Sequence, residues 1–167
     1  ILGRIFRVPV DGKPISILNL SGVPSEVLNV VVSVLCRMTF DFALWSEQQV
    51  PLLLVCEEAH RYAPASTTEG FEPTKRALAK LAKEGRKYGI SLGVISQRPS
   101  ELATSVLSQC NTLFALRMTS EHDQDYLRAA MSEATGGLLD SLPSIGNGEA
   151  IAVGEGVAVP MRMVFNI

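Results

Sequence analysis

The sequence predicts an α/β fold in which a mostly parallel sheet is flanked by helices. Short apolar runs alternate with segments of helical periodicity from residue 15 to residue 131, as in a chain of βα units with right-handed crossovers. Glycine and proline then punctuate residues 142–167, which favours a terminal β-hairpin. With 167 residues, of which 47% are hydrophobic and 19% charged, the chain is long enough for one domain with a substantial core.

The first predicted elements are a short strand at 15–20 and a long helix after it. Ser25 is a favourable N-cap residue, and Glu26 would meet the positive end of the helix dipole. Apolar residues then recur at helical spacing, which predicts one buried face. That face comprises Val27, Val30, Val31, Val34, Leu35, Met38 and Phe42. Residues 46–51 end the helix.

An apolar run at 52–56 is typical of a buried parallel strand, and Glu57 and Glu58 stand where that strand would end. Successive strand side chains alternate between the two faces of a sheet, so the two carboxylates should not point the same way. The pattern fits a Walker B element, in which one carboxylate holds a metal and the other activates a water molecule. It also fits a strand that ends in two solvated glutamates.

Residues 61–72 are rich in Pro, Ser, Thr and Gly and predict an exposed loop, too long to be a simple connection. Pro73 suits the first turn of a helix that runs to about Tyr88, with Gly89 as its C-cap. The two sides of this helix differ. The predicted core side comprises Ala77, Leu78, Leu81, Ala82 and Tyr88, and the basic side comprises Lys75, Arg76, Lys80, Lys83, Arg86 and Lys87.

The alternation continues with a strand at 90–96 and a short helix that has Ser100 as its N-cap and ends near Gln109. A third strand at 112–118 and an amphipathic helix at 122–131 follow. Two apolar runs at 149–153 and 157–165, joined by a turn at 154–156, complete the predicted hairpin.

Polar residues at strand ends are the candidate functional residues, because α/β sheets bind ligands beyond the carboxyl ends of their strands. Phosphoryl transfer to water needs a carboxylate near Mg²⁺, a group that orients the attacking water and a cation that stabilises the transition state. Glu57, Glu58, Gln97 and Arg86 could supply these groups. Taken separately, Gln97 could simply cap a strand, and Arg86 could be one more solvated charge.

Composition gives little support to other kinds of site. Cys36, Cys56 and Cys110 are far apart, which argues against a disulfide framework or a zinc ribbon. Cys56 and His60 together provide only two of the four ligands of a structural zinc. The net charge of −2 neither predicts nor excludes a nucleic-acid partner. No apolar run approaches the roughly 20 residues that span a bilayer, and the first residues lack the layout of a signal peptide, so we expect a cytoplasmic location and no membrane contact.

Several segments, in their order along the chain, resemble the HerA branch of the FtsK/HerA superfamily of hexameric P-loop ATPases. The matching segments are LNLSGVP (18–24), LVCEEAHRYAP (54–64), AKEGRKYG (82–89), ISQRPSEL (95–102), LSQCNT (107–112) and LPSIGNGEA (142–150). The resemblance runs from about residue 15 to the end. It implies a RecA-like P-loop NTPase core whose cofactors are ATP and Mg²⁺.

The resemblance also implies a role for each candidate residue. Glu57 would be the Walker B carboxylate that holds Mg²⁺ through water, and Glu58 the base that polarises the attacking water. Gln97 would be the sensor that contacts the γ-phosphate. Arg86 would be the arginine finger offered to the nucleotide of the neighbouring subunit.

Two glycines and one missing motif complete the comparison. By the same resemblance, Gly146 and Gly148 would lie near the nucleotide or the subunit boundary. The phosphate-binding motif G-x-x-x-x-G-K-[ST] does not occur, because the only Gly-Lys pair, at 12–13, is followed by proline and lacks the upstream glycine. Since the chain also begins with Ile, we expect 1–167 to be a single partial domain, the C-terminal part of an ATPase domain, which alone binds nucleotide poorly and is inactive.

Three functions remain open at this point. The first is an ATP-hydrolysing, homohexameric helicase or translocase that acts on double-stranded DNA in end processing with a NurA-type nuclease. The second is the ATPase of a conjugation or secretion motor of the same superfamily. The third is a non-hydrolysing interaction module that keeps the fold. The loop at 61–72 and the basic side near Lys80 and Lys83 are either DNA or subunit contacts or solvated surface.

Overall fold

The computed structural model describes residues 2–7, 14–66, 72–130 and 136–166. Three short 3₁₀ turns lie among these residues, namely η1 (Ala59–Arg61), η2 (Gly85–Tyr88) and η3 (Pro99–Glu101). The helices are α1 (Leu2–Ile5), α2 (Ser25–Trp45), α3 (Glu72–Glu84), α4 (Thr104–Leu107), α5 (Glu121–Ala130) and α6 (Gly136–Leu139). The strands are β1 (Leu52–Cys56), β2 (Ile90–Val94), β3 (Thr112–Leu116), β4 (Glu149–Gly154) and β5 (Met161–Val164).

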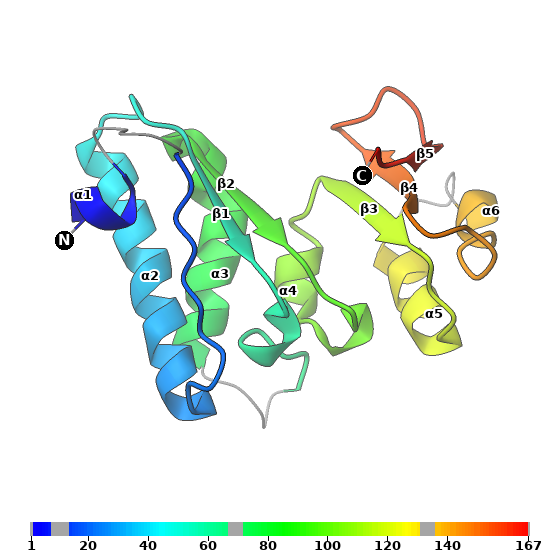
Figure 1. The fold of residues 1–167 in the computed structure, drawn as a ribbon, viewed down its shortest axis with the longest axis horizontal. Helices are drawn as coiled ribbons and strands as arrows, with labels where there is room; N and C mark the ends of the chain where they lie inside the picture. The colour runs from blue at the N-terminus through cyan, green and yellow to red at the C-terminus, as the bar shows by residue number, and fades with distance from the viewer. Residues whose placement is uncertain (1, 8–13, 67–71, 131–135, 167) are drawn as a thin grey trace.

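The described strands form two sheets. β1 and β2 pair in parallel, with Leu52 opposite Ile90, whereas β3, β4 and β5 form an antiparallel sheet in that order. In Figure 1 the arrows of β1, β2 and β3 point the same way, and β3 is the strand of its sheet nearest to β2. Within the described residues, no strand pairs with the edges that β2 and β3 turn toward each other. The predicted α/β class and the terminal hairpin are confirmed. Of the predicted mostly parallel sheet, only β1 and β2 pair in parallel among the described strands, and β3 pairs instead with the hairpin.

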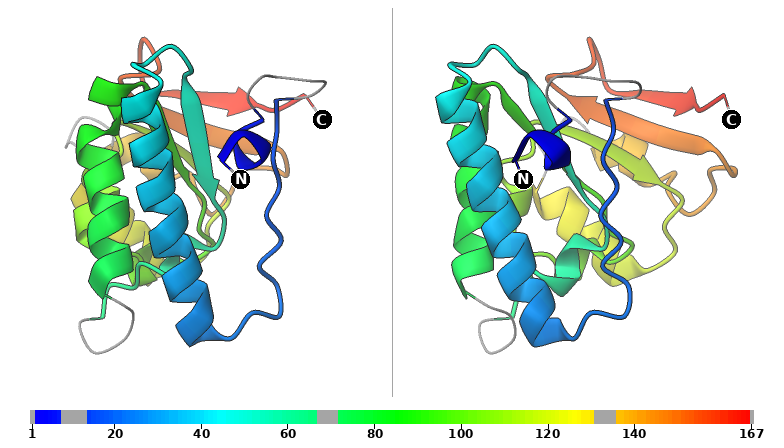
Figure 2. Two further views of the ribbon diagram at one scale, coloured as in Figure 1. Left: turned by 90° about the vertical axis from the view of Figure 1, so that its left-hand side faces the viewer. Right: turned by 60° about the vertical axis from the view of Figure 1, so that its left-hand side comes forward.

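The segment at 15–20 is not a strand. Residues 14–20 have no regular secondary structure, and Figure 2 shows them on the side of β1 that faces away from α2 and α3. Ile15 and Ile17 are 65% and 87% exposed. The prediction is wrong because an apolar run becomes a strand only where its backbone groups find a partner, and no described strand pairs with this one.

Helix α2 buries a different face from the predicted one. It begins at Ser25 with Pro24 as N-cap and has no side-chain cap, so Ser25 is its first helical residue. Its buried residues are Leu28, Val32, Cys36, Thr39 and Ala43, whereas Val27, Val30 and Val34 are about half exposed. The helix is apolar on more than one side, so periodicity alone could not select the face. Contact with α3 selects it, including a hydrogen bond of 2.7 Å from the Thr74 hydroxyl to the carbonyl of Asn29.

The two faces of α2 should respond differently to truncation. Leu28→Ala is expected to lower the free energy of unfolding by about 2–5 kcal/mol, because Leu28 is 3% exposed and its removal leaves a cavity. Val27→Ala, at a position 51% exposed, should cost less than about 1 kcal/mol. Urea titration of the two variants measures both costs. An equal or larger cost for Val27→Ala would support the face that the sequence predicted.

Helix α2 is also long and apolar enough to cross a membrane by length and composition alone. This finding corrects the expectation that no segment approaches that length. A core helix of a globular protein passes the same test, and α2 contributes Leu28, Val32 and Cys36 to the core beside α3. The finding is therefore weak grounds for a membrane span.

Helix α3 follows the prediction except at its first turn. Leu78 and Leu81 are buried, and Gly89 ends the following turn with a φ of 74°. Lys75, predicted on the basic side, is instead only 8% exposed, because its ammonium group donates to the carbonyl of Ser66 and pairs with Glu72 at 3.7 Å. The exposed basic residues that remain are Arg76, Lys80, Lys83, Arg86 and Lys87.

Candidate functional site

The carboxyl ends of β1 and β2 lie side by side at one edge of their sheet. Backbone hydrogen bonds continue past the strands, from Ile95 N–H to the carbonyl of Cys56 at 2.9 Å and from Ala59 N–H to the carbonyl of Ile95 at 3.0 Å. Glu57 and Glu58 lie between these two bonds on one side, and Ser96 follows them on the other. The predicted Walker B and sensor segments are therefore neighbours.

The two adjacent glutamates occupy different environments. Glu57 is exposed, and in the described part of the chain its carboxylate makes no ion pair or hydrogen bond. Glu58 has the left-handed backbone conformation, with φ 49° and ψ 44°, and its side chain is 41% exposed. A non-glycine residue adopts this conformation only where its surroundings hold it, and here 3₁₀ turn η1 begins at once after Glu58.

Tyr62 contacts the residue that directly follows β1. Its hydroxyl donates a hydrogen bond to the backbone carbonyl of Glu57. Burial, followed by the neighbouring Cys56, raises the pKa of Tyr62 to about 12, so the phenol keeps the proton that it donates. Burial also raises the pKa of Cys56 to about 11, which makes this thiol a core group rather than a nucleophile or metal ligand.

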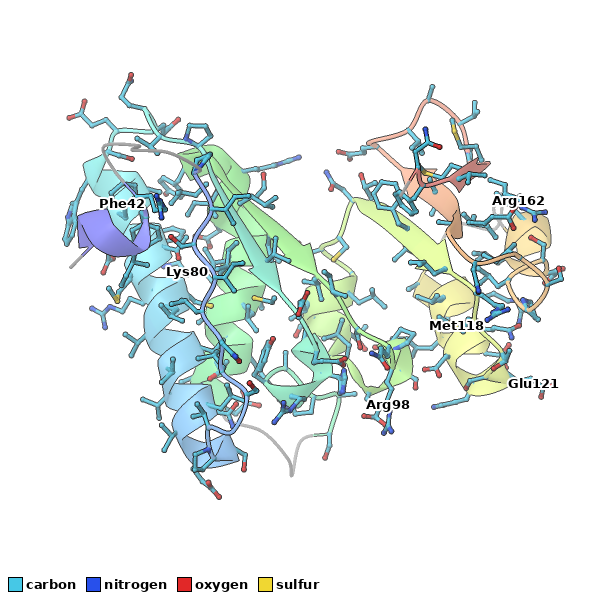
Figure 3. All side chains as sticks on the ribbon, viewed as in Figure 1. Phe42, Lys80, Arg98, Met118, Glu121 and Arg162 are labelled. Carbon is cyan, nitrogen blue, oxygen red and sulfur yellow. The ribbon has the colours of Figure 1, made fainter. Side chains whose placement is uncertain are left out.

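The segment after β2 is joined to the segment after β1 along its length. Ala103 N–H donates to the carbonyl of Ala63 at 2.8 Å, and Ala65 N–H donates to the carbonyl of Glu101 at 2.7 Å. Gln97 is exposed, and among the described residues its amide makes no hydrogen bond. Arg98, labelled at this edge in Figure 3, pairs with Glu101 at 2.8 Å. Within residues 96–98, the Gln97 amide is thus the side-chain group that has no hydrogen-bond partner among the described residues.

Helix α5 anchors the same segment from the other side, which sequence reasoning missed. The Ser100 backbone N–H and hydroxyl both donate to one carboxylate oxygen of Asp123, at 3.1 and 2.6 Å. The Tyr126 hydroxyl donates to the carbonyl of Leu102 at 2.7 Å. Ser100 therefore lies in η3 and binds α5, which corrects its assignment as a helix N-cap. The available signal was the spacing of Asp123 and Tyr126, three residues apart on one helix face.

The Asp123 carboxylate should stabilise the fold in a pH-dependent way. Burial opposes its ionisation, but the hydrogen bonds from Ser100 outweigh this and hold the pKa of Asp123 below its usual value. A lowered folded-state pKa gives stability that is present above the unfolded value and is lost as the pH falls through the folded value. Asp123→Asn should therefore lower the free energy of unfolding by about 1 kcal/mol at neutral pH. The difference should begin to shrink as the pH falls through the unfolded carboxyl value of about 4, and it should vanish once the pH lies below the lowered folded-state pKa. Urea titrations across this range measure it.

Asp41→Asn provides the control for Asp123, because among the described residues Asp41 forms only a pair with Arg37, at 3.8 Å, on the surface. This variant should change stability little at any pH. A loss in Asp123→Asn that persisted unchanged in acid would contradict the role of the charge.

The predicted glycines lie at a related position on the other sheet. Leu116 pairs with Ala150, so the loop with Gly146 and Gly148 adjoins the carboxyl end of β3. Gly146 N–H donates to the carboxylate of Glu149, and Gly148 has a φ of 76°. The hydrogen bond from Arg162 to the Glu149 carboxylate, followed by the one from Gly146 N–H, lowers the pKa of Glu149. The amide of Gly146 thus already has an internal acceptor, and the nucleotide role of both glycines stays a prediction.

Arg86 lies away from the other candidate residues. It belongs to η2, which precedes β2, and the next residues lead to Gly89, whose carbonyl accepts from Leu52 N–H at the start of β1 at 2.9 Å. Arg86 is exposed at the amino ends of the strands, whereas Glu57 and Gln97 follow the carboxyl ends. The structure therefore does not bring Arg86 to the carboxylates of its own chain.

A pocket of about 980 Å³ is lined by residues of the segments that follow β1 and β2, but not by Glu57 or Glu58. It lies next to the first turns of α2 and does not include Glu57 or Gln97 in its lining. The lining residues are Ser25, Glu26, Asn29, Val30, His60, Arg61, Pro64, Ala65, Ser66, Ser100 and Glu101. We therefore do not equate this pocket with the predicted nucleotide position.

The Glu57 carboxylate suits Mg²⁺. This ion is commonly held by one or two carboxylates, with water and substrate phosphates as the remaining ligands. Glu57 meets that need, because it is exposed at the end of a parallel strand and no described residue forms an ion pair with it. Among the described residues, no group of three His, Cys, Asp or Glu side chains gathers as a metal site. Glu57 would thus act with groups of the substrate rather than in a cage made by this chain.

Comparison with solved structures defines the fold class. The genome packaging NTPase B204 of Sulfolobus turreted icosahedral virus 2, in complex with AMP, superposes with a TM-score of 0.67 over 97% of this chain and 70% of that one, at 12% identity. The same NTPase in complex with ATP-gammaS superposes with a TM-score of 0.60 over 80% of this chain and 62% of that one, also at 12% identity. The chain has the α/β fold of a P-loop packaging NTPase. No family model matches the sequence.

Sequence relatives identify the particular type of protein within this fold class. The DNA double-strand break repair helicase HerA of Pyrococcus furiosus is 42% identical over 111 residues, which are 66% of this chain and 19% of that protein. The HerA helicase of Sulfolobus acidocaldarius is 30% identical over 152 residues, 87% of this chain and 30% of that one. The chain is of the HerA type. It spans between about a fifth and a third of the length of these relatives.

Proposed function

We propose that this chain provides the Walker B and sensor half of an ATP-hydrolysing DNA translocase of the HerA type. The observation that carries the proposal is the joining of two polar strand ends at one edge. Glu57 and Glu58 follow β1, Gln97 follows β2, and backbone hydrogen bonds hold the two segments in one register. This is the arrangement in which an α/β sheet presents groups to a ligand.

In this proposal each side chain performs one part of phosphoryl transfer to water. Mg²⁺, when bound with ATP, supplies positive charge at the phosphates, and Glu57 holds it through water. Glu58 accepts a hydrogen bond from the attacking water and takes its proton as the bond from the water oxygen to the γ-phosphorus forms and the bond from that phosphorus to the bridging oxygen of ADP breaks. The exposed Gln97 amide donates to an oxygen of the γ-phosphate. The difference in environment between Glu57 and Glu58 supports their different tasks.

Arg86 serves the neighbouring subunit in the proposed hexamer. A transition state of phosphoryl transfer gains from a cation at the transferred group. Arg86 is exposed at the amino ends of β1 and β2, whereas Glu58 follows the carboxyl end of β1. Arg86 therefore cannot stabilise the transferred phosphoryl group at the site of its own chain. In the proposed ring, the surface of one subunit that carries Arg86 faces the surface of the next subunit that carries Glu58.

The phosphate-binding half would come from another part of the whole protein. β2 and β3 point the same way, and the edges that they turn toward each other have no partner among the described strands (Figure 1). One further parallel strand would pair with both edges and satisfy their backbone groups. Its carboxyl end would then lie beside Glu57, Glu58 and Gln97, and a glycine-rich loop at that end would cradle the phosphates.

Double-stranded DNA is the proposed substrate for translocation, and a NurA-type nuclease the proposed partner, within the cytoplasm. Support for DNA comes from the relatives, which are named as DNA double-strand break repair helicases. The exposed basic residues Arg76 and Lys83 on α3 could contact the phosphate backbone.

The whole protein that carries this sequence provides the test. Its ATP hydrolysis is to be measured with and without double-stranded DNA, and its gene read ahead of the codon for Ile1. We expect DNA-stimulated hydrolysis and a glycine-rich loop that ends in Lys-Ser or Lys-Thr. Hydrolysis without any response to DNA would favour the conjugation or secretion motor. The absence of both the loop and hydrolysis would favour the non-hydrolysing interaction module.

A further inference from the structure

His60 connects the two halves of the candidate site. Turn η1 follows Glu58 and brings the imidazole back over the strand ends, where its side chain is only 14% exposed. The ring atom Nδ1 lies 2.9 Å from the hydroxyl oxygen of Ser96 and 3.5 Å from Oε2 of Glu58. The same nitrogen therefore faces Ser96, which directly precedes Gln97, and the carboxylate of Glu58.

The two oxygens decide which nitrogen of His60 carries the proton. A bare Nδ1 would direct its lone pair at the negative carboxylate of Glu58, whereas Nδ1–H is attracted by both oxygens. The Ser96 oxygen also accepts a hydrogen bond from Arg98 N–H at 3.1 Å, which fixes it in the turn. The network thus favours Nδ1–H, donating to Ser96 and directed at Glu58.

We propose that His60 is a positioning residue that holds the Glu58 carboxylate and the turn at 96–98 in one arrangement. The inference rests on the proposed function, in which Glu58 activates water and Gln97 contacts the γ-phosphate. Because Gln97 directly follows Ser96, a displacement of Gln97 by the phosphate passes through Ser96 and His60 to Glu58. The left-handed backbone of Glu58 places the side chain where the imidazole can reach it.

The test uses the whole protein and compares His60→Ala and His60→Asn with His122→Ala as control. Asparagine keeps an N–H donor near the position of Nδ1, and His122 is an exposed histidine on α5. We expect His60→Ala to lower kcat about 10-fold or more while KM for ATP and the melting temperature change little. His60→Asn should recover part of the loss, and His122→Ala should behave as wild type.

A second pair of variants separates positioning from a general structural role. In a Glu58→Gln background, His60→Ala should lower kcat by clearly less than it does alone, because part of its effect passes through the Glu58 carboxylate. A wild-type kcat in His60→Ala would overturn the inference, as would a fully additive loss in the double variant. Equal losses in His60→Ala and His60→Asn with a lowered melting temperature would overturn it too. A wild-type protein that binds but never hydrolyses ATP would instead refute the proposed function.

Discussion

Glu58→Gln in the whole protein is expected to lower kcat for ATP hydrolysis by about 100-fold or more, the usual contribution of a general base. The amide has the size of the carboxylate but cannot draw a proton from water. Nucleotide affinity should change little, because Glu58 contacts the attacking water rather than the phosphates. Steady-state turnover and equilibrium binding of a fluorescent, non-hydrolysable ATP analogue measure the two quantities.

Glu47→Gln is the matched control. Glu47 is also a non-glycine residue with a φ of 49°, so both substitutions place glutamine in the same strained backbone conformation. Glu47 follows α2, away from the carboxyl ends of the strands, and is exposed. Its variant should turn over ATP at the wild-type rate. Unchanged turnover in Glu58→Gln would refute the role of Glu58, and equal losses in both would point to the backbone instead.

Arg86→Ala is expected to lower kcat by about 1000-fold, within the range measured for arginine fingers. The exposed position of Arg86 predicts that the loss occurs without a change in stability. Lys87→Ala, which removes the neighbouring exposed cation, is the control and should keep most of the activity. Turnover and melting temperature of both variants test this expectation.

Either of two results would argue against the finger. Comparable losses in Arg86→Ala and Lys87→Ala would indicate a general effect of positive charge on this surface. Retained activity in Arg86→Ala would show that another cation stabilises the transition state.

The sequence predicts most of the parts that local patterns determine. The apolar run before Glu57 does form β1, and Gly89 does end the turn after α3. The terminal hairpin also forms, but β4 extends to Gly154 and β5 begins at Met161 rather than at 157, so the connection is longer than predicted. These features depend on a few neighbouring residues, either through a strand with one periodicity or through a glycine at positive φ.

The parts that depend on partners could not be predicted in the same way. Helix α2 is apolar on several sides, so only its contact with α3 shows that Leu28 rather than Val27 is buried. The segment at 15–20 has the composition of a strand but no strand beside it. In the site, the link from Ser100 to Asp123 spans 23 residues, and the link from His60 to Ser96 spans 36. Such pairs follow from topology rather than from spacing.

The role of Arg86 shows the limit most clearly. The resemblance assigns Arg86 as an arginine finger for the neighbouring subunit. Within a single chain, Arg86 lies at the amino ends of β1 and β2, and Glu58 lies at their carboxyl ends. The central claim is thus that one catalytic site is completed by groups from two copies of the chain.

Mixing two inactive variants of the whole protein tests that claim most directly. A subunit with Arg86→Ala keeps Glu58, and a subunit with Glu58→Gln keeps Arg86, so adjacent copies in a mixed ring can assemble one complete site. We predict that an equimolar mixture, allowed to exchange subunits, regains ATP hydrolysis well above the sum of the two separate variants. A mixture that exchanges subunits yet stays as inactive as its components would contradict the account.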